Sequence, residues 1–329
     1  MIRRATASEP IKVLGFTDAH LDDYAGCCRM TMKLIKETVE TEKPDMVVFV
    51  GDNITGGDNL GRVRDFTDMM TLLNVPWAPV LGNHEGDNPY SVTREEMVRI
   101  FMTSPCCLIP DTTVALKDGS PVWGHANYSV PLYNDAGETC RRLIFLDGGS
   151  DMSNEDRLRL GFGDMKRTVY DYLKNSQIKW YLEEIHEDKC PSTVFCHIPL
   201  PEHEEAVEKG ELLAGYNLEG ICCSKYNSGM FDAMKEAGKT TAFVVGHDHV
   251  NASRYLYKGV QFIYNRMSGL SSYNAISSKG KDKLMQGCSI YYIHDDGHVE
   301  FDEILYEDRY PQYHDDIYAV IRTKDKPAS

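Results

Sequence analysis

The chain has 329 residues, of which 42% are hydrophobic and 26% charged, an ordinary globular composition that argues against intrinsic disorder. Its 50 acidic and 35 basic residues give a formal net charge of −15, so long polyanions such as nucleic acids are disfavoured as partners. No apolar run approaches the ~18 residues that span a bilayer, and the first residues lack the apolar segment of a signal peptide, so no membrane association is expected.

Apolar runs and helical patterns alternate through the first three quarters of the chain. Strands are predicted over 11–16, 46–50, 76–81, 142–147, 193–196 and 241–245, and helices over 24–41, 63–74, about 168–188 and 229–237. This alternation predicts βαβ units and a mostly parallel sheet.

After about residue 250 the pattern changes to strand-like runs separated by the turn signals Lys258-Gly259 and Asp296-Gly297. These signals predict antiparallel hairpins. Because no internal repeat or low-complexity linker is present, we expect a single domain over 1–329 with two packed sheets and a frayed tail from about 322. The ten cysteines include no C-x-x-C motif, which favours reduced thiols and a cytoplasmic location.

Polar side chains follow five of the predicted strands at the point where each strand ends. The segments read DAH from residue 18, GDN from 51, GNHE from 82, HIP from 197 and GHDH from 246. Because ligands bind at the carboxyl ends of strands in open α/β sheets, we expect these groups to converge in space. The predicted metal ligands are Asp18, His20, Asp52, Asn83, His197, His247 and His249.

The chemistry of these side chains suits divalent metal ions, because carboxylates, imidazoles and carboxamide oxygens are ligands of Zn, Fe and Mn. Seven side chains exceed what one tetrahedral ion needs and suit two ions that share a bridging carboxylate. Each segment taken alone is more often an ordinary polar turn. Five of the 11 histidines nevertheless fall in these segments, each after an apolar run, and this joint order favours a metal site. His84 remains free to touch a substrate.

The ordered set DAH, GDN, GNHE, H and GHDH, over residues 18 to 249, resembles the calcineurin-like metallophosphoesterase superfamily. The segments GDNITGG and PWAPVLGNHE further resemble the branch of this superfamily that includes Dcr2-type phosphatases and purple-acid-phosphatase-like plant proteins. The resemblance implies a four-layer α/β/β/α sandwich with two mixed sheets and two divalent ions (Mn, Fe or Zn). By this resemblance Asp18, His20 and His249 would hold one ion and Asn83, His197 and His247 the other, with Asp52 bridging.

The resemblance also implies a mechanism of phosphoester hydrolysis. A metal-bridging hydroxide would attack phosphorus in line, and His84 would assist the leaving group or stabilise the developing charge. Glu85 would orient the His84 imidazole. Purple acid phosphatases carry a Tyr three residues after the bridging Asp and D-x-G in the first block. Here Thr55 and His20 occupy those positions, so a purple ferric site is not expected.

The expected substrate is a small phosphomonoester, with two alternatives. The same metals could serve a phosphodiesterase or nucleotidase, or the fold could be a non-catalytic binding scaffold. Because all seven ligand positions and His84 are filled, we favour an enzyme. Candidate substrate contacts are Asn53, His125 and Tyr128, although bracing of the loop is the favoured role for Asn53. Residues 266–275 could also reach the site, and the acidic segment 203–229 could form a rim over it or a solvated loop.

Overall fold

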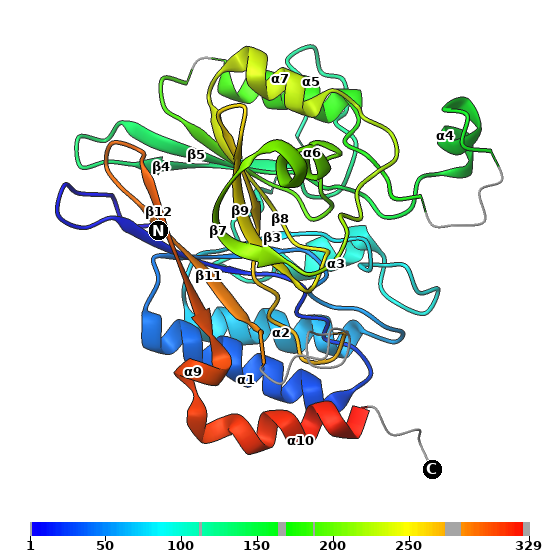
Figure 1. Ribbon diagram of the computed structural model, residues 1–329, viewed down its shortest axis with the longest axis vertical. Coiled ribbons are helices and arrows are strands. Elements are labelled where there is room, and N and C mark those ends of the chain that lie inside the picture. The colour runs from blue at the N-terminus through cyan, green and yellow to red at the C-terminus, as the bar shows by residue number, and fades with distance from the viewer. Residues whose placement is uncertain (1, 112–113, 164–168, 187, 274–283, 325–329) are drawn as a thin grey trace.

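The computed structural model describes residues 2–111, 114–163, 169–186, 188–273 and 284–324. Two β-sheets pack face to face, and helices cover the outer side of each (Figure 1). The predicted four-layer α/β/β/α sandwich with two mixed sheets is therefore confirmed.

The first sheet has the strand order β12-β11-β1-β2-β3. Strands β1, β2 and β3 run parallel, β11 is antiparallel to β1, and β12 is antiparallel to β11. The central strands are buried on both faces, which explains why their sequences read as continuous apolar runs. The bounds are β1 Ile11–Phe16, β2 Met46–Val50, β3 Trp77–Val80, β11 Gly287–Ile293 and β12 Val299–Leu305.

The second sheet has the order β4-β5-β6-β8-β10-β9-β7. Strands β5, β6, β8 and β10 are parallel, and antiparallel strands flank them on both sides. The predicted hairpin at Lys258-Gly259 joins β9 to β10, and both turn residues have positive φ (49° and 81°), as a type I′ turn requires. The bounds are β4 Tyr128–Tyr133, β5 Thr139–Phe145, β6 Ser192–Phe195, β7 Glu211–Asn217, β8 Thr240–Val245, β9 Asn251–Tyr257 and β10 Val260–Tyr264.

The helices divide between the two outer layers (Figure 1). Helices α1 and α2 lie against the first sheet, α10 packs on the outer side of α1, and α5, α6 and α7 lie against the second sheet. Within the described residues, none of the helices combines the length and apolar character needed to cross a bilayer. The bounds are α1 Ala25–Glu42, α2 Leu60–Leu73, α3 Arg94–Phe101, α4 Asn154–Arg159, α5 Asn175–Ile185, α6 Glu202–Lys209, α7 Met230–Ala237, α9 Tyr306–Arg309, η1 Pro311–Tyr313 and α10 His314–Lys324.

The helix predicted from about 168 begins later, at Asn175, and residue 168 lies outside the described residues. The residues before α5 pair with an earlier loop instead of coiling. Met152 N donates a hydrogen bond to Val169 O at 2.7 Å, and Asp171 N donates to Ser150 O at 2.8 Å. This tertiary pairing overrides the local helical pattern.

The segment 203–229 is more regular than a rim or a solvated loop, because most of its first half forms α6 and the edge strand β7. Helices α3, α4, α6, α9 and α10 have no counterpart among the predicted elements. Residues 322–324 of the predicted frayed tail belong to α10, and 325–329 lie outside the described residues. All ten cysteines are described, and none forms a disulfide.

An aromatic cluster anchors α2 to the first sheet. Phe66 of α2 is fully buried and contacts Phe49, Trp77 and Phe101, with ring centroids 4.8 to 6.1 Å apart. Several of these contacts are edge-to-face, which is the favoured geometry of aromatic pairs. The cluster fixes the layer beneath the strands that carry the polar segments.

We predict that Phe66→Ala lowers the free energy of unfolding by about 3–5 kcal/mol, because it leaves a cavity inside this cluster. The matched control is Leu72→Ala on the same helix, where the side chain is 86% exposed, and its effect should stay within about 0.5 kcal/mol. Equilibrium urea denaturation measures both. Equal effects of the two substitutions would contradict this account of the core.

Candidate functional site: two groups of metal-type ligands

The first group of polar side chains follows β1 and β8. His249 Nε2 lies 3.1 Å from His20 Nε2 and 3.4 Å from Asp18 Oδ1, and His20 Nε2 lies 3.8 Å from the same carboxylate oxygen. One ligand-type atom from each of the three residues lies within 4.8 Å of the other two. This spacing allows the group to hold one ion.

A second group meets the first at Asp52. It comprises Asp52, His197 and His247, whose ligand-type atoms also lie within 4.8 Å of one another. Asp52 Oδ2 lies 3.1 Å from His197 Nε2 and 3.7 Å from His20 Nε2, so this carboxylate stands between the two groups. Asn83 directly precedes His84, whose backbone N–H donates to Asp52 Oδ1 at 2.8 Å.

Several polar atoms here are buried without a hydrogen-bond partner among the described residues. Such orphaned atoms carry a desolvation penalty unless a ligand satisfies them. A pair of divalent ions fits this donor set, because each orphaned atom is an oxygen or imidazole nitrogen of the kind that such ions bind. The atoms are Asp18 Oδ1, Asn83 Oδ1, His197 Nε2 and His247 Nε2.

Backbone strain is concentrated at the same residues. Asp18, His20, Asp52 and His247 have φ values of 51°, 43°, 49° and 77°, in the left-handed region that non-glycine residues seldom adopt. Each residue lies two to four positions after the end of a strand. Such outliers cluster at functional sites, where the surrounding structure holds them in place.

Two glycines permit the close approach of the ligand-bearing turns. A Cβ added at Gly51 would lie 2.4 Å from His197 Nδ1, and one added at Gly82 would lie 2.2 Å from Asp52 Oδ1. No side chain fits at these distances. The glycine before each polar residue is therefore needed to bring the turns together, and Gly51 also has a positive φ of 86°.

Hydrogen bonds to neighbouring backbone and side-chain atoms orient the candidate ligands. His197 Nδ1 donates to Val50 O at 2.7 Å, which leaves Nε2 facing the group. Thr17 Oγ1 donates to Asp18 Oδ2 at 2.7 Å. Supporting contacts of this kind are typical around metal ligands.

The electrostatics of the site are dominated by two buried carboxylates. Burial alone would raise the pKa of Asp52, but the neighbouring His197, His20 and His84 together outweigh burial and hold this pKa far below its ordinary range. Burial would lower the pKa of His197, yet Asp52 and Asp18 raise it to about 10. Burial lowers the pKa of His247 to about 3, and the charge on His197 acts in the same direction.

His84 lines the cavity into which the candidate ligands open, and its side chain is 46% exposed. Its Nδ1 lies 2.6 Å from Asp87 Oδ2, and this hydrogen bond is the main reason why the pKa of His84 rises to about 9. Asp87, and not Glu85, therefore orients the imidazole. The prediction that Glu85 would orient His84 is wrong.

Glu85 instead fixes the turn that carries Asp52. It is fully buried, and its two carboxylate oxygens accept hydrogen bonds from the backbone N–H groups of Asp52, Asn53, Ile54 and Gly82. These distances run from 2.5 to 3.3 Å. One carboxylate thus ties the GDN turn to the GNHE turn.

The candidate groups open into a cavity of about 180 Å³. Tyr170 packs edge-on against His247 at 4.5 Å, and Tyr273 stacks on His249 at 4.1 Å. The cavity is lined by Asp52, His84, Tyr170, Cys222, His247, Asp248, His249, Ser272 and Tyr273. Ser272 and Tyr273 belong to the segment 266–275, so this segment does reach the site, which the sequence had left open.

Asp248 links the site to the end of the segment 203–229. Its Oδ2 accepts hydrogen bonds from the Tyr264 hydroxyl at 2.5 Å and from the Cys222 backbone at 3.1 Å.

The three candidate substrate contacts differ in position. Asn53 is buried and braces its loop, because Nδ2 donates to Val80 O at 3.0 Å. Tyr128 is 1% exposed, stacks on Phe145 and donates its hydroxyl to Pro79 O, so a direct substrate contact by Tyr128 is excluded. The alternation of the strand turns this ring toward the core. His125 lines a separate, larger cavity.

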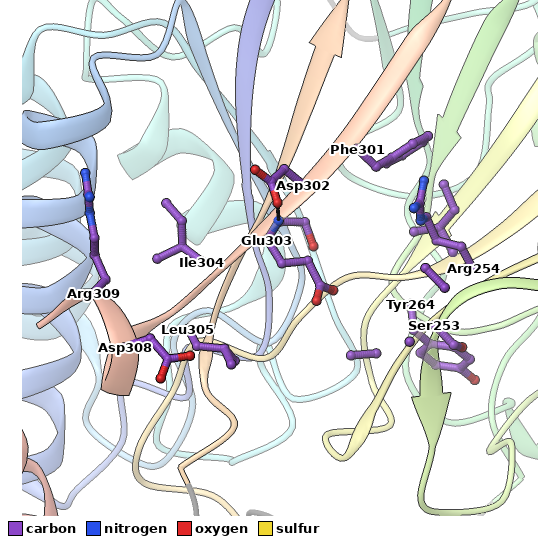
Figure 2. Close-up of a pocket in the computed structure, with 15 residues that line it drawn as sticks. Ser253, Arg254, Tyr264, Phe301, Asp302, Glu303, Ile304, Leu305, Asp308 and Arg309 are labelled. Carbon is purple, nitrogen blue, oxygen red and sulfur yellow. Dashed lines mark hydrogen bonds between the residues drawn. The ribbon is translucent and has the colours of Figure 1, made fainter. Parts of the chain in front are cut away.

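Figure 2 shows another cavity, of about 540 Å³, away from the candidate ligands. It lies where β7, β9 and β10 face β12, with Arg254 close to the ring of Phe301. None of the seven predicted ligands lines it. The candidate metal ligands therefore line a smaller cavity than this one.

Sequence reasoning missed Asp87, Tyr170 and Asp248, and it included Tyr273 only within the segment 266–275 that could reach the site. Asp87 had a signal, since a carboxylate three residues after a histidine can reach back to its ring. Tyr170 had none, because it comes from a segment without a motif and reaches the site only through the tertiary fold.

We predict that Glu85→Gln lowers the free energy of unfolding by about 1–3 kcal/mol, because an amide NH₂ would face backbone N–H groups that the carboxylate now satisfies. The control is Glu95→Gln on α3, where the exposed carboxylate contacts Arg99, and its effect should be below about 0.5 kcal/mol. Denaturant titration of the metal-free proteins measures both. An unchanged stability in Glu85→Gln would contradict the assigned role.

Comparison with known proteins agrees with this geometry. The calcineurin-like phosphoesterase family matches residues 11–251. "Probable inactive purple acid phosphatase 14" of Arabidopsis thaliana is 30% identical over 272 residues, which cover 75% of this chain and 64% of that protein. Phosphatase DCR2 of Saccharomyces cerevisiae is 30% identical over 275 residues, covering 73% of this chain and 44% of that protein. The chain thus spans less than two thirds of the length of these relatives.

Solved structures share the fold at low sequence identity. A dimetal phosphatase from Danio rerio has a TM-score of 0.56 and 17% identity, over 91% of this chain and 100% of that one. GAP50, described as the anchor in the inner membrane complex of Plasmodium, has a TM-score of 0.50 and 13% identity, over 90% and 84% of the two chains. The strand-end motifs, the two sheets and the family match agree: the chain belongs to the calcineurin-like phosphoesterase family.

Proposed function

We propose that this protein is a phosphoester hydrolase that uses two divalent metal ions, with small phosphomonoesters as its substrates. The observation that carries the proposal is the pair of ligand groups that meet at Asp52. One ion would be held by Asp18, His20 and His249 and the other by Asn83, His197 and His247, with Asp52 shared between them. Mn, Fe(II) and Zn all suit this oxygen and nitrogen donor set.

When bound, the two ions would supply positive charge for the phosphoryl oxygens and would lower the pKa of a water molecule so that it can act as the nucleophile. The chain's own contribution is to hold the ligands in strained turns and to exclude bulk water. Tyr170 and Tyr273 would exclude water by packing against His247 and His249, respectively.

His84 would hold a proton at Nε2 for the substrate. Its Nδ1 is engaged with Asp87, so the other ring nitrogen is free to donate to a phosphoryl or leaving-group oxygen. The backbone N–H of His84 is bound to Asp52, which fixes the imidazole relative to the ligand groups. No side chain needs to form a covalent phosphoenzyme.

A non-catalytic scaffold is the second candidate. It is favoured by names among the relatives, which include "probable inactive" purple acid phosphatases and an anchor protein of the same fold. The complete set of ligand-type residues in this chain argues for an enzyme, since a scaffold has no need for orphaned buried donors. A phosphodiesterase on the same groups is the third candidate, although the central cavity of about 180 Å³ suits a compact ester better.

We predict that the protein, reconstituted with Mn²⁺, binds about two ions per chain and hydrolyses p-nitrophenyl phosphate faster than bis-p-nitrophenyl phosphate. His247→Ala should lower the metal content to about one, since it removes a ligand from one group only. His298→Gln, at an exposed position outside the site, is the control and should retain both ions. Elemental analysis and initial rates measure these outcomes. A protein that binds both ions and cleaves neither ester would support the scaffold.

We predict that His84→Ala lowers kcat by about 10²–10³-fold while leaving the metal content unchanged, because it removes a proton donor and no ligand. Asp87→Asn should have a smaller effect, since the imidazole is kept and only its orientation is weakened. A loss of metal in His84→Ala would make His84 a ligand and would contradict its assigned role.

A further inference from the structure

A cavity of about 610 Å³ lies on the Asn83 side of the candidate site. Two contacts place it against the ligand-bearing turn. Ser150, which lines the cavity, donates its hydroxyl to Asn83 O at 2.6 Å. Arg94, also in the lining, donates to Gly82 O at 2.6 Å and to Glu85 O at 3.0 Å. The cavity and the proposed metal groups therefore share one thin wall.

The wall is a short antiparallel ribbon. Residues 150–152 pair with 169–171 through hydrogen bonds of 2.7 and 2.8 Å. Tyr170 of this ribbon turns toward His247, whereas Asp151 and Asp171 line the larger cavity. The ribbon thus borders both cavities, which puts the larger cavity beside the position proposed for the substrate phosphate.

Aromatic side chains give the cavity its character. Trp123 is 38% exposed and lies against Gly149, where an added Cβ would be 2.9 Å from the indole. Tyr172 packs edge-on against Tyr226 at 4.7 Å, and Lys174 Nζ lies 3.6 Å from the Tyr172 ring centroid and 5.2 Å from that of Trp123. The cavity thus offers ring faces beside a cation.

The cations of the cavity are already neutralised. Lys174 Nζ lies 2.7 Å from Asp156 and 2.6 Å from Asp171. Arg159 also pairs with Asp156, and Arg94 with Asp147. Because no strong positive charge is left over, the cavity is poorly suited to a second phosphate. It suits an uncharged, flat group that stacks on the rings.

We propose that this cavity binds the leaving group of the substrate and that Trp123 stacks on it, so the preferred substrates are phosphomonoesters of aromatic or heteroaromatic alcohols or of alcohols that carry such a ring. This inference rests on the proposed function. His125, predicted as a substrate contact, lines the same cavity and lies near the same group.

The position of the tryptophans provides a direct binding signal. The chain has three, and Trp77 and Trp180 are buried in the two cores with 0% and 4% exposure. Trp123 is the exposed one. A ring that stacks on it should change the fluorescence of Trp123, and Trp123→Phe should abolish that change while keeping an aromatic surface.

The experiment compares benzylphosphonate with cyclohexylmethylphosphonate on the Mn²⁺-loaded protein. Both carry an unhydrolysable C–P bond and a six-membered ring, and only one ring is aromatic. We expect benzylphosphonate to bind roughly 5–10-fold more tightly and to quench Trp123. In Trp123→Phe the preference should persist by calorimetry without the quench, and in Trp123→Ala it should disappear.

Equal affinities for the two phosphonates, or a quench that survives in Trp123→Phe, would overturn the proposal. Hydrolysis of simple alkyl phosphates in that case would leave the proposed function intact. If neither phosphonate bound the metal-loaded protein and no ester were cleaved, the proposed function itself would fail.

Discussion

Two buried carboxylates set the conditions for the rest of this structure. Asp18 and Asp52 are each 1% exposed and lie at the ends of adjacent parallel strands. A buried charge is costly unless another charge or a set of hydrogen bonds compensates it. Among the described residues, neither carboxylate has a lysine or arginine partner, and the ion pairs that they do form are all with imidazoles. An arrangement of this kind is built to receive external positive charge.

The same constraint explains features that lie outside the site. Glycines at the ends of β2 and β3 are needed because the turns nearly touch. Glu85 is buried among backbone N–H groups because the turn around Asp52 leaves those donors without partners. Both sheets deliver their strand ends to one place, so the sandwich brings together residues that are more than two hundred positions apart.

The sequence predicted most of the parallel core and the members of both ligand groups, because strand ends and polar segments coincide along the chain. It failed where tertiary contacts decide the outcome. Residues 169–171 were expected to form the start of a helix, but they pair with residues 150–152 instead. The side chain of Tyr128 was expected to contact substrate, but it is buried in the core. Glu85 was wrongly assigned to the His84 imidazole and Asp87 was overlooked, since only the folded turn shows which carboxylate reaches the imidazole and which reaches the backbone. The aromatic cavity around Trp123 draws on segments with no shared pattern.

The central claim is that two metal ions occupy this site and share Asp52. Anomalous diffraction from crystals soaked in Mn²⁺, recorded at the manganese edge, tests it most directly. The account predicts two peaks on opposite sides of Asp52, one among Asp18, His20 and His249 and the other among Asn83, His197 and His247. A single peak, or two peaks that do not both adjoin Asp52, would contradict it.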